Sequence, residues 1–81
     1  MNSFNLNVAK SFLGKNVNLH LKDGSVIVNV QLAEIQKDEM RGEIFVSCIS
    51  HGKGNRLKIP LRSIAWAKPI DLYIIETRTK N

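Results

Sequence analysis

The sequence predicts a mainly β protein, a small and strongly bent barrel of five strands with a short helix at its N-terminus. The clearest observation is an alternation of apolar and polar residues over 16–21, which resumes over 26–32. Asp23 and Gly24 lie between the two segments, an arrangement typical of an antiparallel β-hairpin with one buried face. A twisted hairpin of this length, with a helical pattern before it and apolar segments after it, is typical of a small barrel.

The first element that we expect is a short helix. Asn5 or Asn7 can cap its N-terminus, and Gly14 can end it. One apolar stripe follows the helical spacing i, i+3 and i+7: Leu6, Ala9 and Leu13. Because so short a helix is not stable by itself in water, we expect it to lie on the barrel and close one open end.

The predicted hairpin joins a strand at 16–21 to a strand at about 25–35 through a turn at 22–25. Seven residues are expected to share its buried face: Val17, Leu19, Leu21, Val26, Val28, Val30 and Leu32. Both faces of the second strand are apolar at 26–28, so we expect this strand to be central and bent. Residues 36–42 are interpreted as a charged connector.

Three further strands are expected at 43–50, 56–59 and 64–67. Pro60 cannot donate a ladder hydrogen bond, so the second of these strands should end there or lie at a sheet edge. A tight corner at 60–63 is then expected to lead into the last strand of the barrel.

The remaining segments complete one domain over residues 1–81, with its core at about 5–69. Residues 51–55 contain two glycines and no apolar residue, and are expected to form a mobile hairpin loop. Residues 70–75 are a candidate for an additional strand, and 76–81 are interpreted as a polar tail.

Length and cysteine count limit how the protein can be stabilised. Eighty-one residues bury only a marginal core, and Cys48, the only cysteine, cannot form a disulfide within the chain. His20 and His51 lack the spacing of metal ligands, so no metal or other cofactor is expected and oligomerisation is the remaining route. Cys48 is predicted to be buried in a strand, and Trp66 in the core or at a subunit contact.

Several function classes are not expected. No leader-like segment opens the sequence and no apolar run approaches about 20 residues, so we expect a soluble cytoplasmic protein without a membrane partner. No glycine-rich phosphate loop precedes a helix, and neither a nucleophile elbow nor an acid–base pair has recognisable spacing. We therefore expect a protein that is not an enzyme and has no catalytic residues.

The net charge of +5 is concentrated in the second half of the chain. Seven bases against three acids between residues 37 and 68 contribute +4 of it: Lys37, Arg41, Lys53, Arg56, Lys58, Arg62 and Lys68, against Asp38, Glu39 and Glu43. Such an excess favours a polyanionic partner such as RNA or DNA through phosphate attraction and counterion release. A merely solvated basic surface is the alternative.

Three segments together resemble the Sm-like family, including its bacterial Hfq branch, over about residues 5–69. They are Leu13-Gly14-Lys15-Asn16-Val17, then Leu21-Lys22-Asp23-Gly24, then Ile59-Pro60-Leu61-Arg62-Ser63-Ile64 running to Pro69. The chain departs from the family pattern at the glycine of the second strand, where Asn29 or Val30 stands. It also lacks the Asn of the loop before the third strand, and has Leu61-Arg62-Ser63 at the corner in place of Arg-Gly or Lys-His.

The resemblance implies a homo-oligomeric ring in which the fourth strand of one subunit pairs with the fifth strand of the next. It places the connector at 36–42 and the corner at 60–63 around the pore, where single-stranded RNA would bind non-covalently. Arg62 could stack on a base and carry charge, Gln36 or Asp38 could read a base edge, and Lys37 and Arg41 could hold phosphate. The expected RNA-binding residues are Gln36, Lys37, Asp38, Arg41, Arg62 and Ser63.

Two other functions are open at this point. One is an Sm-fold or SH3-like homo-oligomeric module for protein interaction or assembly without RNA-base specificity, whose C-terminal apolar segment could add a strand to a protein partner. The other is an SH3-like barrel that binds DNA or associates with the ribosome.

Overall fold

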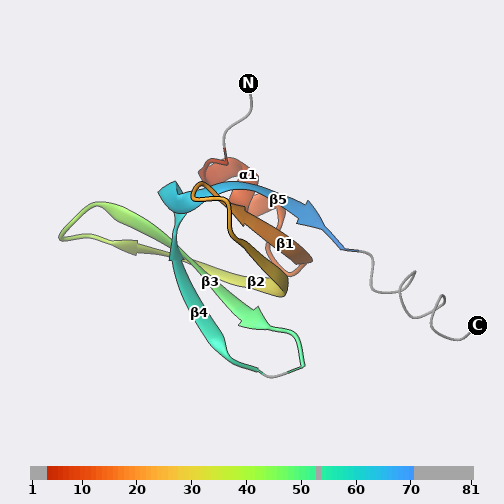
Figure 1. Ribbon diagram of the computed structural model, residues 1–81. Helices are drawn as coiled ribbons and strands as arrows, with labels where there is room; N and C mark the ends of the chain where they lie inside the picture. The colour runs from red at the N-terminus through yellow and green to blue at the C-terminus, as the bar shows by residue number, and fades with distance from the viewer. Residues whose placement is uncertain (1–3, 53, 71–81) are drawn as a thin grey trace, which may run out of the picture.

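A computed structural model of the protein describes residues 4–52 and 54–70 (Figure 1). Its elements in chain order are α1 (Leu6–Ser11), β1 (Asn16–Leu21), β2 (Val26–Asp38), β3 (Glu43–Ser50), β4 (Arg56–Pro60), the 3-10 turn η1 (Leu61–Ser63) and β5 (Ile64–Pro69). The strands form one antiparallel sheet in the order β4-β3-β2-β1-β5. The mainly β class, the five strands and the short N-terminal helix are therefore confirmed.

The sheet is open, with β4 and β5 at its two edges. Within the described residues β4 pairs with β3 and β5 pairs with β1, so closure into a barrel stays a prediction. Pro60 is the last residue of the edge strand β4, as expected. The backbone N–H of Ile70 donates to the carbonyl of Asn16 at 2.8 Å. The rest of the predicted additional strand at 70–75, and the tail at 76–81, lie outside the described residues.

A bulge at Asn29 decides which face of the β1–β2 hairpin is buried. Val17 pairs with Val30 but Leu19 pairs with Ile27, so β2 has one residue more than β1 between these pairs. Asn29 adopts a left-handed φ of 53°, and its backbone N–H donates to Asn18 Oδ1 at 2.8 Å. Such a bulge reverses the alternation of side chains along the strand.

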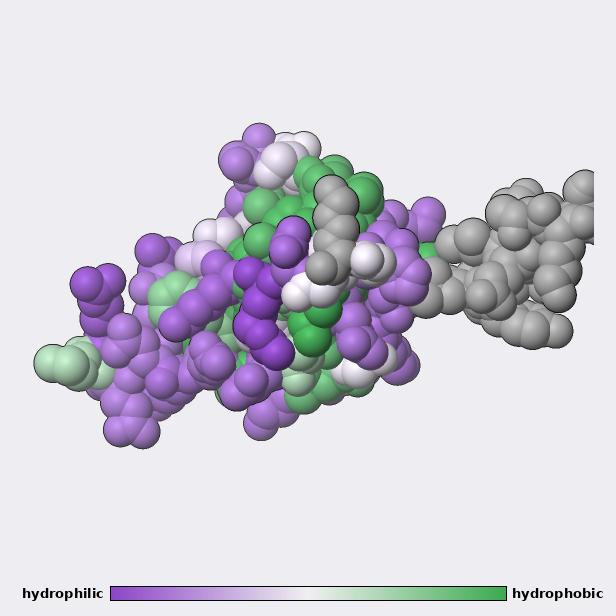
Figure 2. Space-filling view, turned by 90° about the horizontal axis from the view of Figure 1, so that it is seen from below, coloured by the Kyte–Doolittle hydropathy of each residue, from purple (hydrophilic) through white to green (hydrophobic). Residues whose placement is uncertain are grey.

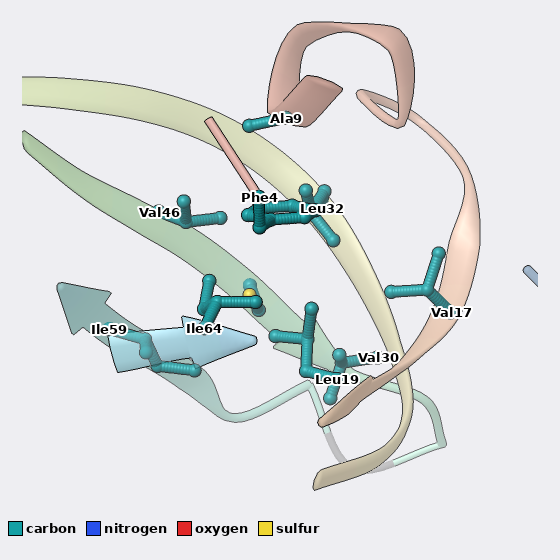
Figure 3. Packing of buried hydrophobic residues seen from close by; sticks show 10 residues of the cluster. Phe4, Ala9, Val17, Leu19, Val30, Leu32, Val46, Ile59 and Ile64 are labelled. Carbon is teal, nitrogen blue, oxygen red and sulfur yellow. The ribbon is translucent and has the colours of Figure 1, made fainter. Parts of the chain in front are cut away.

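The reversal corrects one prediction. Val30 and Leu32 are buried as expected, but Val26 is exposed and Val28 is 65% exposed, because Ile27 takes the core-facing position opposite Leu19. The prediction that Val26 and Val28 belong to the buried face is therefore wrong. The expectation that this strand is central and bent is confirmed, since β2 lies in the middle of the sheet and curves visibly in Figure 3.

The prediction of a connector over residues 36–42 is also wrong. β2 continues to Asp38, and its pairing with β3 extends to the pair of Asp38 with Glu43. The chain reverses only over residues 39–42. Asp38 Oδ1 accepts hydrogen bonds from the backbone N–H groups of Met40 and Arg41 at 3.1 and 3.3 Å, and Gly42 has a φ of 68°. The hairpin projects from the body of the molecule and is mostly hydrophilic (Figures 1 and 2).

The helix α1 covers one side of the sheet. Asn5 caps it, since its Oδ1 accepts from the backbone N–H of Val8 at 2.9 Å, and Ala9 is fully buried. The Phe4 ring lies next to Leu32 beneath the helix (Figure 3). The buried apolar cluster contains Phe4, Ala9, Val17, Leu19, Val30, Leu32, Val46, Cys48, Ile59 and Ile64.

The last strand differs in part from its prediction. β5 runs to Pro69 rather than ending at residue 67. Trp66 pairs with His20 on the face of the sheet away from the core, and the two rings stack with 3.7 Å between their centroids. Trp66 is 49% exposed, so the prediction of a core position is wrong, whereas a subunit contact stays a prediction.

The bulge makes Asn29 sensitive to substitution. We expect Asn29→Ala to lower the free energy of unfolding by about 1–2 kcal/mol, because alanine adopts a left-handed φ unfavourably. Asn29→Gly should change it by less than about 0.5 kcal/mol, because glycine adopts this φ freely. Urea unfolding measures both, with Asn7→Ala on the exposed side of α1 as the control. An equal loss in the alanine and glycine variants would contradict the conformational explanation.

The thiol of Cys48 should be unreactive in the folded protein. Burial raises the pKa of the Cys48 thiol from 9.0 to about 11, so at pH 8 we expect reaction with a thiol reagent only after unfolding in urea. Between about pH 9 and pH 11 the unfolded chain loses this proton first. The stability of the wild type should therefore fall more steeply with pH in this window than that of Cys48→Ala, and equal slopes would contradict the buried thiol.

Candidate nucleic-acid interface

The turn η1 connects the two edge strands and stands between two hollows on the surface. Pro60 enters it in an extended conformation, and the backbone N–H of Ile64 closes it by donating to the carbonyl of Leu61. The backbone N–H of Lys22 donates to the carbonyl of Ser63 at 2.9 Å, which ties the turn to the end of β1. In this frame the Arg62 side chain is 73% exposed and borders both hollows.

The first hollow, which we call the helix-side concavity, is an open space of about 440 Å³. The N-terminal segment, the base of the β2–β3 hairpin and η1 surround it. Its lining residues are Phe4, Asn5, Leu6, Arg41, Gly42, Glu43, Ile44, Leu61 and Arg62. It therefore combines an apolar surface with two guanidinium groups and one carboxylate.

An ion pair holds Arg62 at this concavity. Its Nη1 donates to Glu43 Oε2, and the Glu43 side chain is only 16% exposed. A guanidinium has five N–H donors in a planar fork, so this bond leaves Arg62 with donors for a second acceptor. The ion pair therefore holds the Arg62 guanidinium in position and uses only part of its N–H donors.

The structure brings some of the predicted binding residues together. Arg41 and Arg62 line the same concavity. Lys37 pairs with Ile44 across the hairpin and so lies on the same face as this lining residue, whereas Gln36 pairs with Phe45 on the opposite face. Each residue's role in binding RNA stays a prediction.

Two other predicted residues have structural contacts. Asp38 Oδ1 accepts the two backbone N–H groups of the hairpin turn. Ser63 accepts from Lys22 through its carbonyl oxygen and lines the second hollow rather than the helix-side concavity.

Sequence reasoning missed the apolar lining of the concavity. The connector at 36–42 contains only one large apolar residue, Met40. The apolar lining comes from three other segments, which contain Phe4, Leu6, Ile44 and Leu61. One signal was available, because an apolar residue just before a helix cap commonly packs on the fourth helical residue. Phe4 precedes the cap Asn5, and Ala9 is that fourth residue.

The second hollow, which we call the turn-side groove, measures about 410 Å³. It lies between the β1–β2 turn and β4. Its lining residues are Leu21, Lys22, Asp23, Lys58, Ile59, Pro60, Arg62 and Ser63. Arg62 is therefore shared by the groove and the helix-side concavity.

Basic residues also lie on the outer face of β3 and β4. Arg56 Nη1 donates to Ser47 Oγ at 3.0 Å, and Lys58 Nζ lies 4.9 Å from the centroid of the Phe45 ring. Arg56 and Lys58 therefore share one face of β4. The cation–π contact directs the ammonium of Lys58 along the sheet surface.

Among residues 4–52 and 54–70, no three His, Cys, Asp or Glu side chains are close enough together to hold a metal ion. The helical residues that the structure describes include no segment of the length and apolar character needed to cross a bilayer.

Comparison with protein-family models, with curated proteins and with solved structures finds no match to this chain. The geometry of the helix-side concavity and of the turn-side groove is therefore the basis on which a function can be argued.

Proposed function

We propose that the protein binds single-stranded RNA non-covalently in the helix-side concavity, as a homo-oligomeric Sm-like barrel. The observation that carries this proposal is the juxtaposition of an apolar surface with Arg41 and Arg62 in one hollow. Duplex RNA hides its base faces, whereas an unpaired base can lie flat on an apolar surface while its phosphate meets a cation. No covalent step is part of this function.

The concavity has a place for each part of a nucleotide. A base can bury one apolar face against Leu6, Ile44 and Leu61. The adjoining phosphate can accept hydrogen bonds from Arg62, which Glu43 already holds in position. Arg41 lines the same hollow and can neutralise the phosphate charge.

Assembly through the sheet edges is the second part of the proposal. β4 and β5 end the sheet on opposite sides, so each presents backbone groups that a neighbouring strand can pair with. Pairing of β4 in one copy with β5 in the next would satisfy both edges and repeat η1 around an assembly. A chain of this size gains stability from such contacts.

One observation favours the second candidate, an assembly module that does not bind RNA bases. Val26, Val28 and Trp66 expose apolar surface on the face of the β1, β2 and β5 strands that points away from the core. Exposed apolar groups in proximity often mark a protein contact. On this alternative the basic residues would serve solubility alone.

Binding of short labelled RNA tests the proposal. We expect uridine-rich or adenine-rich oligonucleotides to bind with an affinity that falls as salt rises, with a slope of log K against log salt of about −1.4 for two phosphate contacts on a single strand. Arg41→Gln should weaken binding by roughly tenfold, because it removes one charged hydrogen-bonding partner, and should make the slope shallower by about 0.7.

The matched control is Lys10→Gln, which removes one positive charge from the exposed side of α1, outside both hollows. Fluorescence anisotropy at two salt concentrations gives the affinities, and mass determination in solution gives the number of copies. Absence of RNA binding at low salt would remove the RNA part of the proposal and favour the assembly module. A stable monomer would remove the edge-to-edge part.

A further inference from the structure

We propose that the turn-side groove is a second binding site, one that takes a phosphate or pyrophosphate group. Three cationic residues line it: Lys22 after β1, Lys58 in β4 and Arg62 in η1. The Nζ of Lys58 lies over the Phe45 ring on the outer face of the sheet, so Lys22 and Arg62 are the cations that the proposal uses. Leu21, Ile59 and Pro60 form its apolar wall. Neither the charge pattern nor the family resemblance had assigned a role to Lys22.

The groove is built by the fold and does not depend on one flexible side chain. The backbone hydrogen bond from Lys22 to Ser63, at 2.9 Å, holds the end of β1 against η1. The β1–β2 turn lies beside η1 in Figure 1, although about forty residues separate them in sequence. The backbone therefore holds Lys22 next to η1, the turn that contains Arg62.

The charges around the groove are unbalanced. The lining residues include three cations and the carboxylate of Asp23, and the Arg62 cation is ion-paired with Glu43, so the net charge of these five side chains is +1. Asp23 is engaged elsewhere, because its Oδ1 accepts from the Ser25 hydroxyl at 2.6 Å and from the Ser25 backbone N–H at 2.9 Å. The hydrogen bond from the Ser25 hydroxyl, followed by that from its backbone N–H, lowers the pKa of Asp23. Like charges held near one another repel, and a bound dianion relieves that repulsion.

The groove continues the helix-side concavity, since Arg62 borders both. A single strand whose base lies in the concavity would pass over Arg62 and place its next phosphate beside Lys22. This path rests on the proposed function, whereas binding of a phosphoanion in the groove does not. Edge pairing of β4 uses its backbone groups, while the anion uses the side chains of Lys22 and Arg62.

Titration with inorganic pyrophosphate tests the groove without RNA. In ¹H–¹⁵N spectra we expect the largest shifts at the backbone amides of Lys22, Ile59 and Ser63. Lys22→Gln should weaken pyrophosphate binding by about three- to tenfold, the effect of removing one partly screened charge contact. Lys10→Gln should leave it unchanged, because Lys10 does not border the groove.

Two results would overturn the proposal: no saturable shift at the groove amides, or equal pyrophosphate affinity in wild type and Lys22→Gln. Thermal unfolding shows whether Lys22→Gln is folded, and Lys22→Arg, which keeps the charge, should retain binding. Shifts confined to Arg41 and Gly42 would place the anion in the concavity and would also overturn it.

A hexauridylate titration then identifies the source of the phosphate. If the strand follows the path described, Lys22→Gln should weaken hexauridylate and pyrophosphate binding by similar factors. Loss of pyrophosphate binding with unchanged hexauridylate binding would support the groove as a site for a free phosphoanion and refute the strand path. If Arg41→Gln leaves RNA affinity unchanged while Lys22→Gln still weakens pyrophosphate binding, the proposed function fails and the groove stands.

Discussion

The bulge at Asn29 is the constraint on which the rest of the structure depends. Its left-handed backbone and its hydrogen bond to Asn18 place one extra residue in β2. Together with a second register shift between Leu32 and Glu34, this residue lies where β2 passes from pairing with β1 to pairing with β3. Without the bend, the helix, the core and the two edges would not surround a common interior.

The corner at η1 places one cation between the two hollows of this bent sheet. It follows β4 directly and precedes β5, and it contacts β3 through the Arg62–Glu43 ion pair and the turn after β1 through the Lys22–Ser63 hydrogen bond. A side chain that is already held in position loses less conformational freedom when it meets a ligand. Glu43 holds Arg62 in this way, and Arg62 borders both hollows.

Local sequence patterns were sufficient for much of the fold. The bounds of β1 and β3 were predicted correctly because alternation and turn residues are strong there. The exposure of Val28 and the full length of β2 were not predicted. A bulge residue, and two paired strand ends with polar side chains, produce no regular alternation of apolar residues in the sequence. Arg41 and Arg62 were expected at a binding site from the family resemblance, and the structure places both at the helix-side concavity. Phe4, Leu6 and Lys22 were missed because tertiary contacts bring them to the site.

The two margins of the sheet are unlike one another, since β4 carries Arg56 and Lys58 whereas β5 carries Trp66. Any association of copies through these two edges joins different surfaces. It is therefore heterologous, and further copies can add until the assembly closes into a ring. The curvature of β2 then determines whether a growing assembly of copies closes on itself. A variant with a straighter β2 would keep the same contacts but extend into filaments.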